Sequence, residues 1–165
     1  GGGGLGLTLC PNGTPSQTGA GAADANSANC NVAGAPAGDH NLCYHGTHVA
    51  GIAAGFNTSQ STSEPPYGVA KSSQILAVQV FTRFNGATSC KGAANCVRSL
   101  TSDLISGLDY VLANATPGGS PVIAVNMSLG GGLFSGACDS DPLKPSIDNL
   151  RAAGILTVEI GRAHA

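Results

Sequence analysis

The sequence predicts an α/β fold with a mostly parallel sheet covered by helices on both faces. Short apolar runs rich in β-branched residues alternate along the chain with helical patterns, in the order helix, strand, helix, strand, helix, strand. Such alternation is typical of parallel sheets whose crossover connections are helices. With 165 residues the chain is long enough for one domain with a core and short for two.

The first half of the chain contains one predicted helix and one predicted strand. Residues 1–41 are rich in Gly, Ala, Asn and Ser, so we expect a surface loop there, tied down at Cys10 and Cys30. Residues 45–55 follow as a compact helix of small side chains. The run SQILAVQVF (73–81) lies between turn signals and predicts a buried strand, whereas the polar segment 82–96 predicts a loop.

The second half predicts two helices and two strands. Leucine, isoleucine and valine recur at helical spacing in SLTSDLISGLDYVLAN (99–114), where we expect Ser102 to cap the helix and Asp103 to lie in its first turn. PVIAVNMSLGGG (121–132) predicts a second buried strand. DPLKPSIDNLRAAG (141–154) predicts a helix with Pro145 near its start and Gly154 at its end, before a third strand at 155–160.

The composition excludes two classes of partner. Charged residues are 10% of the chain, against roughly 25% in ordinary soluble domains. The net charge of −2 leaves no basic field for a phosphate backbone, and no apolar run approaches the roughly 18–20 residues that span a bilayer. We therefore expect neither a nucleic-acid partner nor a membrane partner.

Six cysteines indicate an oxidising compartment. They are scattered through Gly/Asn/Ser-rich surroundings and form no CxxC pair, which favours disulfides over a zinc or redox site, with the pairing left open; they are Cys10, Cys30, Cys43, Cys90, Cys96 and Cys138. The expected location is extracellular. The chain begins with GGGG and shows no signal-peptide pattern, so we expect an internal piece of a longer, secreted protein.

Three histidines, His40, His45 and His48, are the candidate functional side chains. They are open to three interpretations. Their imidazoles could converge on a metal ion, although no HExxH pattern is present. One could be buried and hydrogen-bonded while the others are solvated. Alternatively, one is a general base at the start of a helix, held close to a sheet by the glycines and alanines that follow.

The segment HGTHVAGIAAG (45–55) resembles the histidine-bearing segment of the subtilisin-like serine proteases. The resemblance implies that His45 is the catalytic general base and that His48 is structural, while His40 falls in a variable loop with no role. YGVAKSSQILAVQVF, VIAVNMSLGGG and AAGILTV resemble three further family segments, the first with Lys71 where a proline is usual. Together they match the family in register over residues 42–158.

The same resemblance implies a fold, a substrate site and a mechanism. The fold would be a subtilisin-like three-layer α/β/α arrangement with a mostly parallel sheet, incomplete at both ends. Ser128, Leu129 and Gly130 would line the substrate cleft by pairing their main chain with a bound polypeptide. The family hydrolyses peptide bonds by a Ser-His-Asp mechanism without a cofactor. Calcium is a common structural ion in it, yet no acidic ligand loop is visible here, and we expect a monomer.

Several family motifs are absent from residues 1–165. The D-[ST]-G motif has no counterpart, because neither Asp24 nor Asp39 follows an apolar strand; G-T-S-x-A-x-P and the oxyanion asparagine are missing too. We therefore expect a partial peptidase domain that is inactive alone. The alternatives are a non-catalytic, secreted, peptide-binding relative of the same fold and, third, a zinc-binding module.

The last seven residues, EIGRAHA, stand where the family has its oxyanion asparagine. The codons GAG-ATC-GGA-AGA-GCA-CAC encode EIGRAH and resemble a common sequencing adapter read in frame. The expected organisation is thus a loop-rich, disulfide-linked segment at 1–41, the family core at 42–158 and a non-native tail at 159–165. His164 has no functional role in this interpretation.

Overall fold

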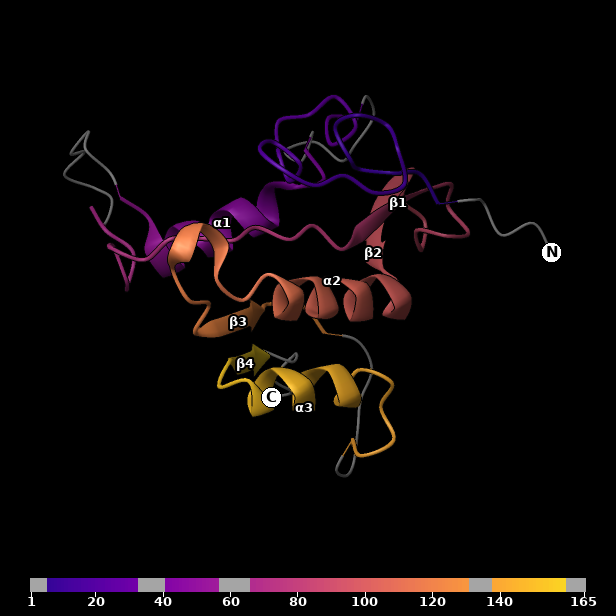
Figure 1. Ribbon diagram of the computed structural model, residues 1–165. Helices are drawn as coiled ribbons and strands as arrows, with labels where there is room; N and C mark the ends of the chain where they lie inside the picture. Colours follow the sequence, from indigo (N-terminus) through magenta and orange to yellow (C-terminus); the bar gives the residue numbers. More distant parts are fainter. Residues whose placement is uncertain (1–5, 33–40, 57–65, 131–137, 160–165) are drawn as a thin grey trace, which may run out of the picture. The chain divides into compact units, whose positions relative to one another are not determined.

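The structure is a computed structural model that describes residues 6–32, 41–56, 66–130 and 138–159. The chain divides into two units, residues 1–98 and residues 99–165. Helices and strands occur in both units (Figure 1), which is the α/β class that the alternating pattern predicts. No helix in the described ranges is long and apolar enough to cross a membrane.

The first unit contains one helix and a two-stranded sheet. The helix α1 spans Tyr44–Ala54, close to the predicted 45–55, and the strands β1 (Phe81–Asn85) and β2 (Asn95–Ser99) are hydrogen-bonded neighbours. The described part of 1–41 has neither helix nor strand, as predicted, and it is tied to β1 by a backbone bridge between Leu7 and Arg83. Among the residues of this unit that the structure describes, the buried apolar side chains are Leu9, Cys30, Val32 and Cys90.

Two disulfides lie in the first unit and confirm the reading of its cysteines. Cys30 pairs with Cys43, and Cys90 pairs with Cys96. Cys10 is not in a disulfide, so the prediction that it ties down the first loop through such a bond is wrong. That loop is held at Cys10 through its backbone instead, because the Asn29 amide donates a hydrogen bond to the Cys10 carbonyl at 2.6 Å.

The predicted strand 73–81 differs from the structure. Residues 73–80 are outside any strand, and β1 begins at Phe81 and continues into the segment that the sequence predicts as a loop. Ile75 is 53% exposed, and Leu76 and Val78 are 36% exposed each. A buried strand needs a neighbour that satisfies its backbone and covers its side chains, and nothing in the described part of the first unit supplies both.

The second unit is a strand–helix–strand arrangement with a further helix. Its elements are α2 (Thr101–Ala113), the 3₁₀ turn η1 (Pro117–Gly119), β3 (Ala124–Met127), α3 (Lys144–Ala152) and β4 (Leu156–Glu159). β3 and β4 pair in parallel, with Ala124 opposite Leu156 and Met127 opposite Glu159, and α3 lies in the connection between them. This is the crossover that the alternation of elements predicts.

The core of the second unit joins both helices to the strand pair. Five side chains form the buried cluster, namely Leu108, Val111, Met127, Leu150 and Ile155. Ser146 on α3 donates a hydrogen bond from its hydroxyl to the Asp109 carboxylate on α2 at 3.0 Å. The helical spacing read from the sequence therefore identifies the packed face of α2 correctly, since Leu108 and Val111 are its buried residues.

The ends of α2 and α3 test the capping predictions. The N-cap of α2 is Leu100, so the prediction of a Ser102 cap is wrong; Ser102 lies inside the helix, whose first turn holds Asp103 as expected. In α3, Pro145 lies near the start as predicted. Gly154 follows the C-cap with φ of +79°, and the Ile155 N–H donates to the Leu150 carbonyl at 2.9 Å. This left-handed glycine and reversed hydrogen bond end α3 as a Schellman motif.

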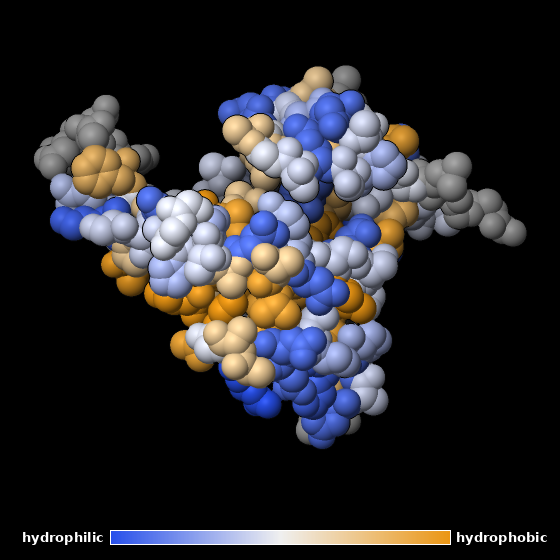
Figure 2. Space-filling view, in the orientation of Figure 1, coloured by the Kyte–Doolittle hydropathy of each residue, from blue (hydrophilic) through white to orange (hydrophobic). Residues whose placement is uncertain are grey.

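The strand pair β3–β4 is covered on one face only. Val125 packs against the core and Met127 is buried, whereas Ala124, Asn126, Leu156 and Val158 on the other face are exposed. Ile123, just before β3, is 71% exposed and Leu156 is 67% exposed. Figure 2 shows that apolar residues, drawn in orange, are exposed on the side of the molecule in view. The sequence predicts strands buried on both faces, and in the described residues of this unit one face lacks a covering layer.

Candidate functional site

His45 is the second residue of α1 and its side chain is exposed. It lines an open pocket together with Asn41, Leu42, Tyr44, Asn95, Cys96 and Val97. The pocket thus combines the segment that enters α1 with the first half of β2. An exposed imidazole at the rim of a pocket is accessible to a substrate, which a general base requires.

His48 lies one turn further along α1 and lines a different pocket, with Ala25, Asn26, Asn41, Tyr44 and Thr47. The structure therefore does not direct His45 and His48 into one site. No three His, Cys, Asp or Glu side chains within the described ranges come together to hold a metal ion. His40 lies outside the described residues, so the metal interpretation finds no support from the two histidines that are placed.

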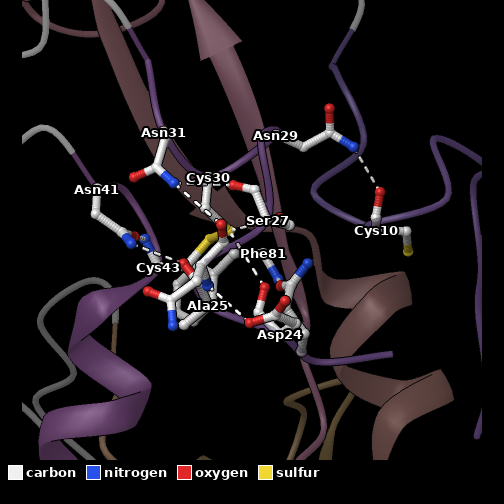
Figure 3. The surroundings of a disulfide bond; sticks show 12 residues. Cys10, Asp24, Ala25, Ser27, Asn29, Cys30, Asn31, Asn41, Cys43 and Phe81 are labelled. Carbon is white, nitrogen blue, oxygen red and sulfur yellow. Dashed lines mark hydrogen bonds between the residues drawn. A yellow bond between two sulfur atoms is a disulfide. The ribbon is translucent and has the colours of Figure 1, made fainter. Parts of the chain in front are cut away.

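The start of α1 is anchored to the preceding loop. The Cys30–Cys43 disulfide joins residues whose Cα atoms are 5.5 Å apart, and Cys43 is the N-cap of the helix. Asn41 lies beside this disulfide (Figure 3), and its amide nitrogen donates to the Ala25 carbonyl at 2.7 Å. Its side-chain oxygen accepts from the Cys43 N–H, also at 2.7 Å.

Sequence reasoning missed Asn41 and the β2 residues of this pocket. One signal for Asn41 was available, because asparagine commonly accepts a hydrogen bond from the backbone N–H two residues ahead, and Cys43 is two residues ahead. Asn95, Cys96 and Val97 carry no such local signal. They reach the pocket of His45 through tertiary structure.

Asp24, one of the two aspartates upstream of His45, belongs to a turn. Its carboxylate accepts a hydrogen bond from the Asn26 N–H at 2.9 Å within the same loop. Asp39 lies outside the described residues. The geometry of Asp24 is that of a local turn residue.

Ser128, Leu129 and Gly130 lie in the second unit and follow β3 directly. The Asn126 amide donates a hydrogen bond to the Ser128 hydroxyl oxygen at 3.0 Å. Leu129 packs its side chain against the core, and Gly130 is exposed. Because the side chain of Leu129 packs against the core, the backbone of this segment is held in place. A fixed backbone is what peptide recognition by main-chain pairing requires.

Comparison with known proteins matches residues 14–158 to the Subtilase family. The alkaline serine exoprotease A of Vibrio alginolyticus is 41% identical over 88 residues, which are 53% of this chain and 12% of that protein. Proteinase T of Parengyodontium album is 38% identical over 88 residues, covering 53% of this chain and 23% of its own length. The subtilisin-like serine protease AsES of Sarocladium strictum is 39% identical over 106 residues, covering 64% and 21% respectively.

The matched segment is thus less than a quarter of the length of each of these serine proteases. No solved structure gives a significant match. The family match covers most of the chain and includes α1, β3 and β4 up to Val158. By this match, and by the motif that it shares at His45, the chain belongs to the subtilase family.

Proposed function

We propose that this chain is part of a secreted serine endopeptidase that hydrolyses peptide bonds by a Ser-His-Asp mechanism, with His45 as the general base. The observation that carries the proposal is the intact HGTHVAG motif, whose first histidine is exposed at the start of α1 and lines a pocket. The family match over residues 14–158 supports it.

The mechanism assigns His45 two proton transfers. A serine hydroxyl is a poor nucleophile until a neighbouring imidazole accepts its proton, and the same imidazole then protonates the leaving amine. An aspartate holds the imidazole in the required tautomer. We propose that the aspartate, the serine and the oxyanion asparagine lie outside residues 1–165, so that this chain alone is inactive.

Substrate binding is assigned to Ser128, Leu129 and Gly130. Their main chain would pair with an extended polypeptide substrate, and the anchoring of Leu129 in the core supports this role. In the complete protein we propose the three-layer α/β/α fold with a mostly parallel sheet. The exposed face of β3–β4 and the exposed side chains of residues 75–78 support it, because apolar surface of this kind is normally covered in parallel sheets.

Further proposals concern the cellular context. We propose that the protein is a monomer and that it is located outside the cell. The disulfides Cys30–Cys43 and Cys90–Cys96 support the location, because disulfides persist in oxidising compartments. The chemistry needs no cofactor, and neither nucleic acid nor membrane is a partner. A structural calcium ion would need oxygen ligands, and the described residues form no acidic cluster for it.

The domain assignment ends at Val158. We propose that residues 1–41 are a disulfide-linked loop region, that 42–158 form the family core and that 159–165 are a non-native tail. The end of the family match at Val158 supports the last point. Glu159, the described part of that tail, is exposed and is the last residue of β4, opposite Met127.

The first test is to determine the gene sequence upstream and downstream of the segment that encodes this chain. We expect a D-[ST]-G motif upstream and G-T-S-x-A-x-P downstream, with EIGRAHA replaced by family sequence. In the full-length protein, His45→Ala should lower kcat on a chromogenic peptide about 10⁶-fold, because the serine loses its proton acceptor. The matched variant His48→Ala should retain most of the activity, since His48 lines a separate pocket.

The alternative is a non-catalytic, secreted, peptide-binding relative of the same fold. Flanks without the aspartate or the serine, together with peptide binding and no turnover, would support it and contradict the endopeptidase. The unbroken HGTHVAG favours the enzyme, because a protein that only binds peptides has no need of the base.

A further inference from the structure

The position of His45 depends on how the chain enters α1. The helix begins at Tyr44, so His45 lies two residues after the N-cap Cys43. The N–H groups in the first turn of a helix have no partners within the helix, and the first turn is therefore the part that frays most easily. The position of the His45 backbone therefore depends on how firmly the N-cap residue Cys43 is held.

Within the described chain α1 is covered only in part, with Val49, Ala50, Ala53 and Ala54 half-buried. The helix has no buried residue, and no side chain caps its N-terminus. Among the described residues, the segment that precedes the helix supplies bonds that hold its first turn.

Four bonds connect residues 41–43 to the loop and to one another. Cys43 is joined covalently to Cys30, which is 2% exposed. The Leu42 N–H donates to the Cys30 carbonyl at 2.9 Å. Asn41 closes the arrangement by using both ends of its amide, as a donor to Ala25 and as an acceptor from Cys43.

Figure 3 shows the disulfide and the Asn41 amide next to each other at the start of α1. The covalent bond limits the distance between the loop and the helix. The two hydrogen bonds of Asn41 also restrict orientation. The amide donates to the Ala25 carbonyl and accepts from the Cys43 N–H, so these two backbone groups are held in a fixed orientation relative to each other.

We propose that Asn41 and the Cys30–Cys43 disulfide are positioning residues for His45, which hold its imidazole in place for proton transfer. This inference rests on the proposed function. It predicts that weakening the anchor lowers kcat and leaves KM unchanged, because the polypeptide is held by the main chain of Ser128–Gly130 and not by His45.

The experiment uses the full-length protein with its own flanking sequence. Asn41→Ala removes both hydrogen bonds and should lower kcat about 10- to 100-fold, since displacements near 1 Å have effects of this size on catalysis. Asn29→Ala is the matched control. Asn29 also donates its amide to a loop carbonyl, that of Cys10, and should leave kcat and KM unchanged.

A second variant separates positioning from folding. Asn41→Ser retains a short side-chain acceptor for the Cys43 N–H and should restore much of the lost kcat. The double variant Cys30→Ser/Cys43→Ser should show the same loss of kcat at unchanged KM. Circular dichroism and thermal unfolding establish for each variant that the protein is folded at the assay temperature.

The outcomes distinguish the inference from the function on which it rests. If the unaltered protein neither cleaves peptides nor reacts with a serine-directed phosphonate, the proposed function fails. If it does both, while folded Asn41→Ala and the double cysteine variant keep normal kcat, the inference alone is overturned. An equal loss in Asn29→Ala would also overturn it, because the effect would then belong to the whole loop.

Discussion

Gly68 lies so close to the end of α1 that one methyl group would collide with backbone. A Cβ atom at this position would meet the Gly55 nitrogen at 2.5 Å, and the Ala54 nitrogen and Gly51 oxygen at 2.7 Å each. The approach is tight because the Gly68 N–H donates to the Gly55 carbonyl at 2.8 Å. None of these atoms belongs to a side chain that could rotate away.

Gly68→Ala should therefore destabilise the first unit. We expect a loss of about 1–3 kcal/mol in the free energy of unfolding, the usual cost of forcing extra atoms into a packed site. Thermal or urea unfolding followed by circular dichroism measures it. Gly51→Ala is the matched control, because its Cβ would meet nothing within 4 Å. Equal stability of the two variants would contradict the close approach.

At the same scale, the motif around His45 locates a helix start correctly, whereas the intrinsic capping preference of Ser102 does not. The histidine was recognised because seven consecutive residues carry the motif, and α1 indeed places it in the first turn of a helix. Ser102 was predicted as a cap from its intrinsic preference. In the structure the helix begins at Thr101, and Leu100 occupies the cap position without a side-chain hydrogen bond.

The helix α3 carries an exposed charge network that depends on pH. Asp148 lies 2.6 Å from the Lys144 ammonium and 3.1 Å from the Arg151 guanidinium. The hydrogen bond from Lys144 is the main cause that lowers the pKa of Asp148 below its ordinary value of 3.8, and the charges of Lys144 and Arg151 act in the same direction.

A lowered pKa stabilises the folded state only while the carboxylate is ionised. The contribution is present above about pH 4, the ordinary range of an aspartate, and is lost as the pH falls through the lower pKa of the folded state. Asp148→Asn should remove this part of the pH dependence, with a small effect because the group is exposed. Unfolding curves at pH 7 and pH 3 for both proteins measure it, and parallel pH profiles would contradict it.

Among the elements, helices were predicted better than strands. The spacing of apolar residues located α2 and α3 within a few residues of their ends. The predicted strand 73–81 is wrong in its first eight residues, while most of β1 and the start of β2 lie in the segment 82–96 predicted as a loop. The sequence does not predict these two strands because they are polar and show no apolar alternation. They are joined in part by a polar contact, in which the Arg83 guanidinium donates to the Asn95 side-chain oxygen at 3.2 Å.

At the scale of the whole molecule, the two disulfides act on one unit. Cys30–Cys43 and Cys90–Cys96 both lie in residues 1–98, whereas the cluster around Leu150 is in the second unit. Reduction should therefore raise amide hydrogen exchange in residues 24–31 and 41–54. It should leave α2 and α3 unchanged, because neither cross-link joins them. Hydrogen–deuterium exchange with mass spectrometry measures this, and a uniform rise along the chain would contradict it.

The sequence by itself determined the family, the choice of His45 as the candidate general base and the approximate positions of the helices, because motifs and helical periodicity are local properties of a chain. Only the tertiary structure decided that Cys30 pairs with Cys43, that Asn41 anchors the start of α1 and that β2 borders the pocket of His45. It also decided which strand faces are covered. Disulfide pairing, anchoring and burial each depend on a partner distant in the sequence, and no local pattern encodes which partner that is.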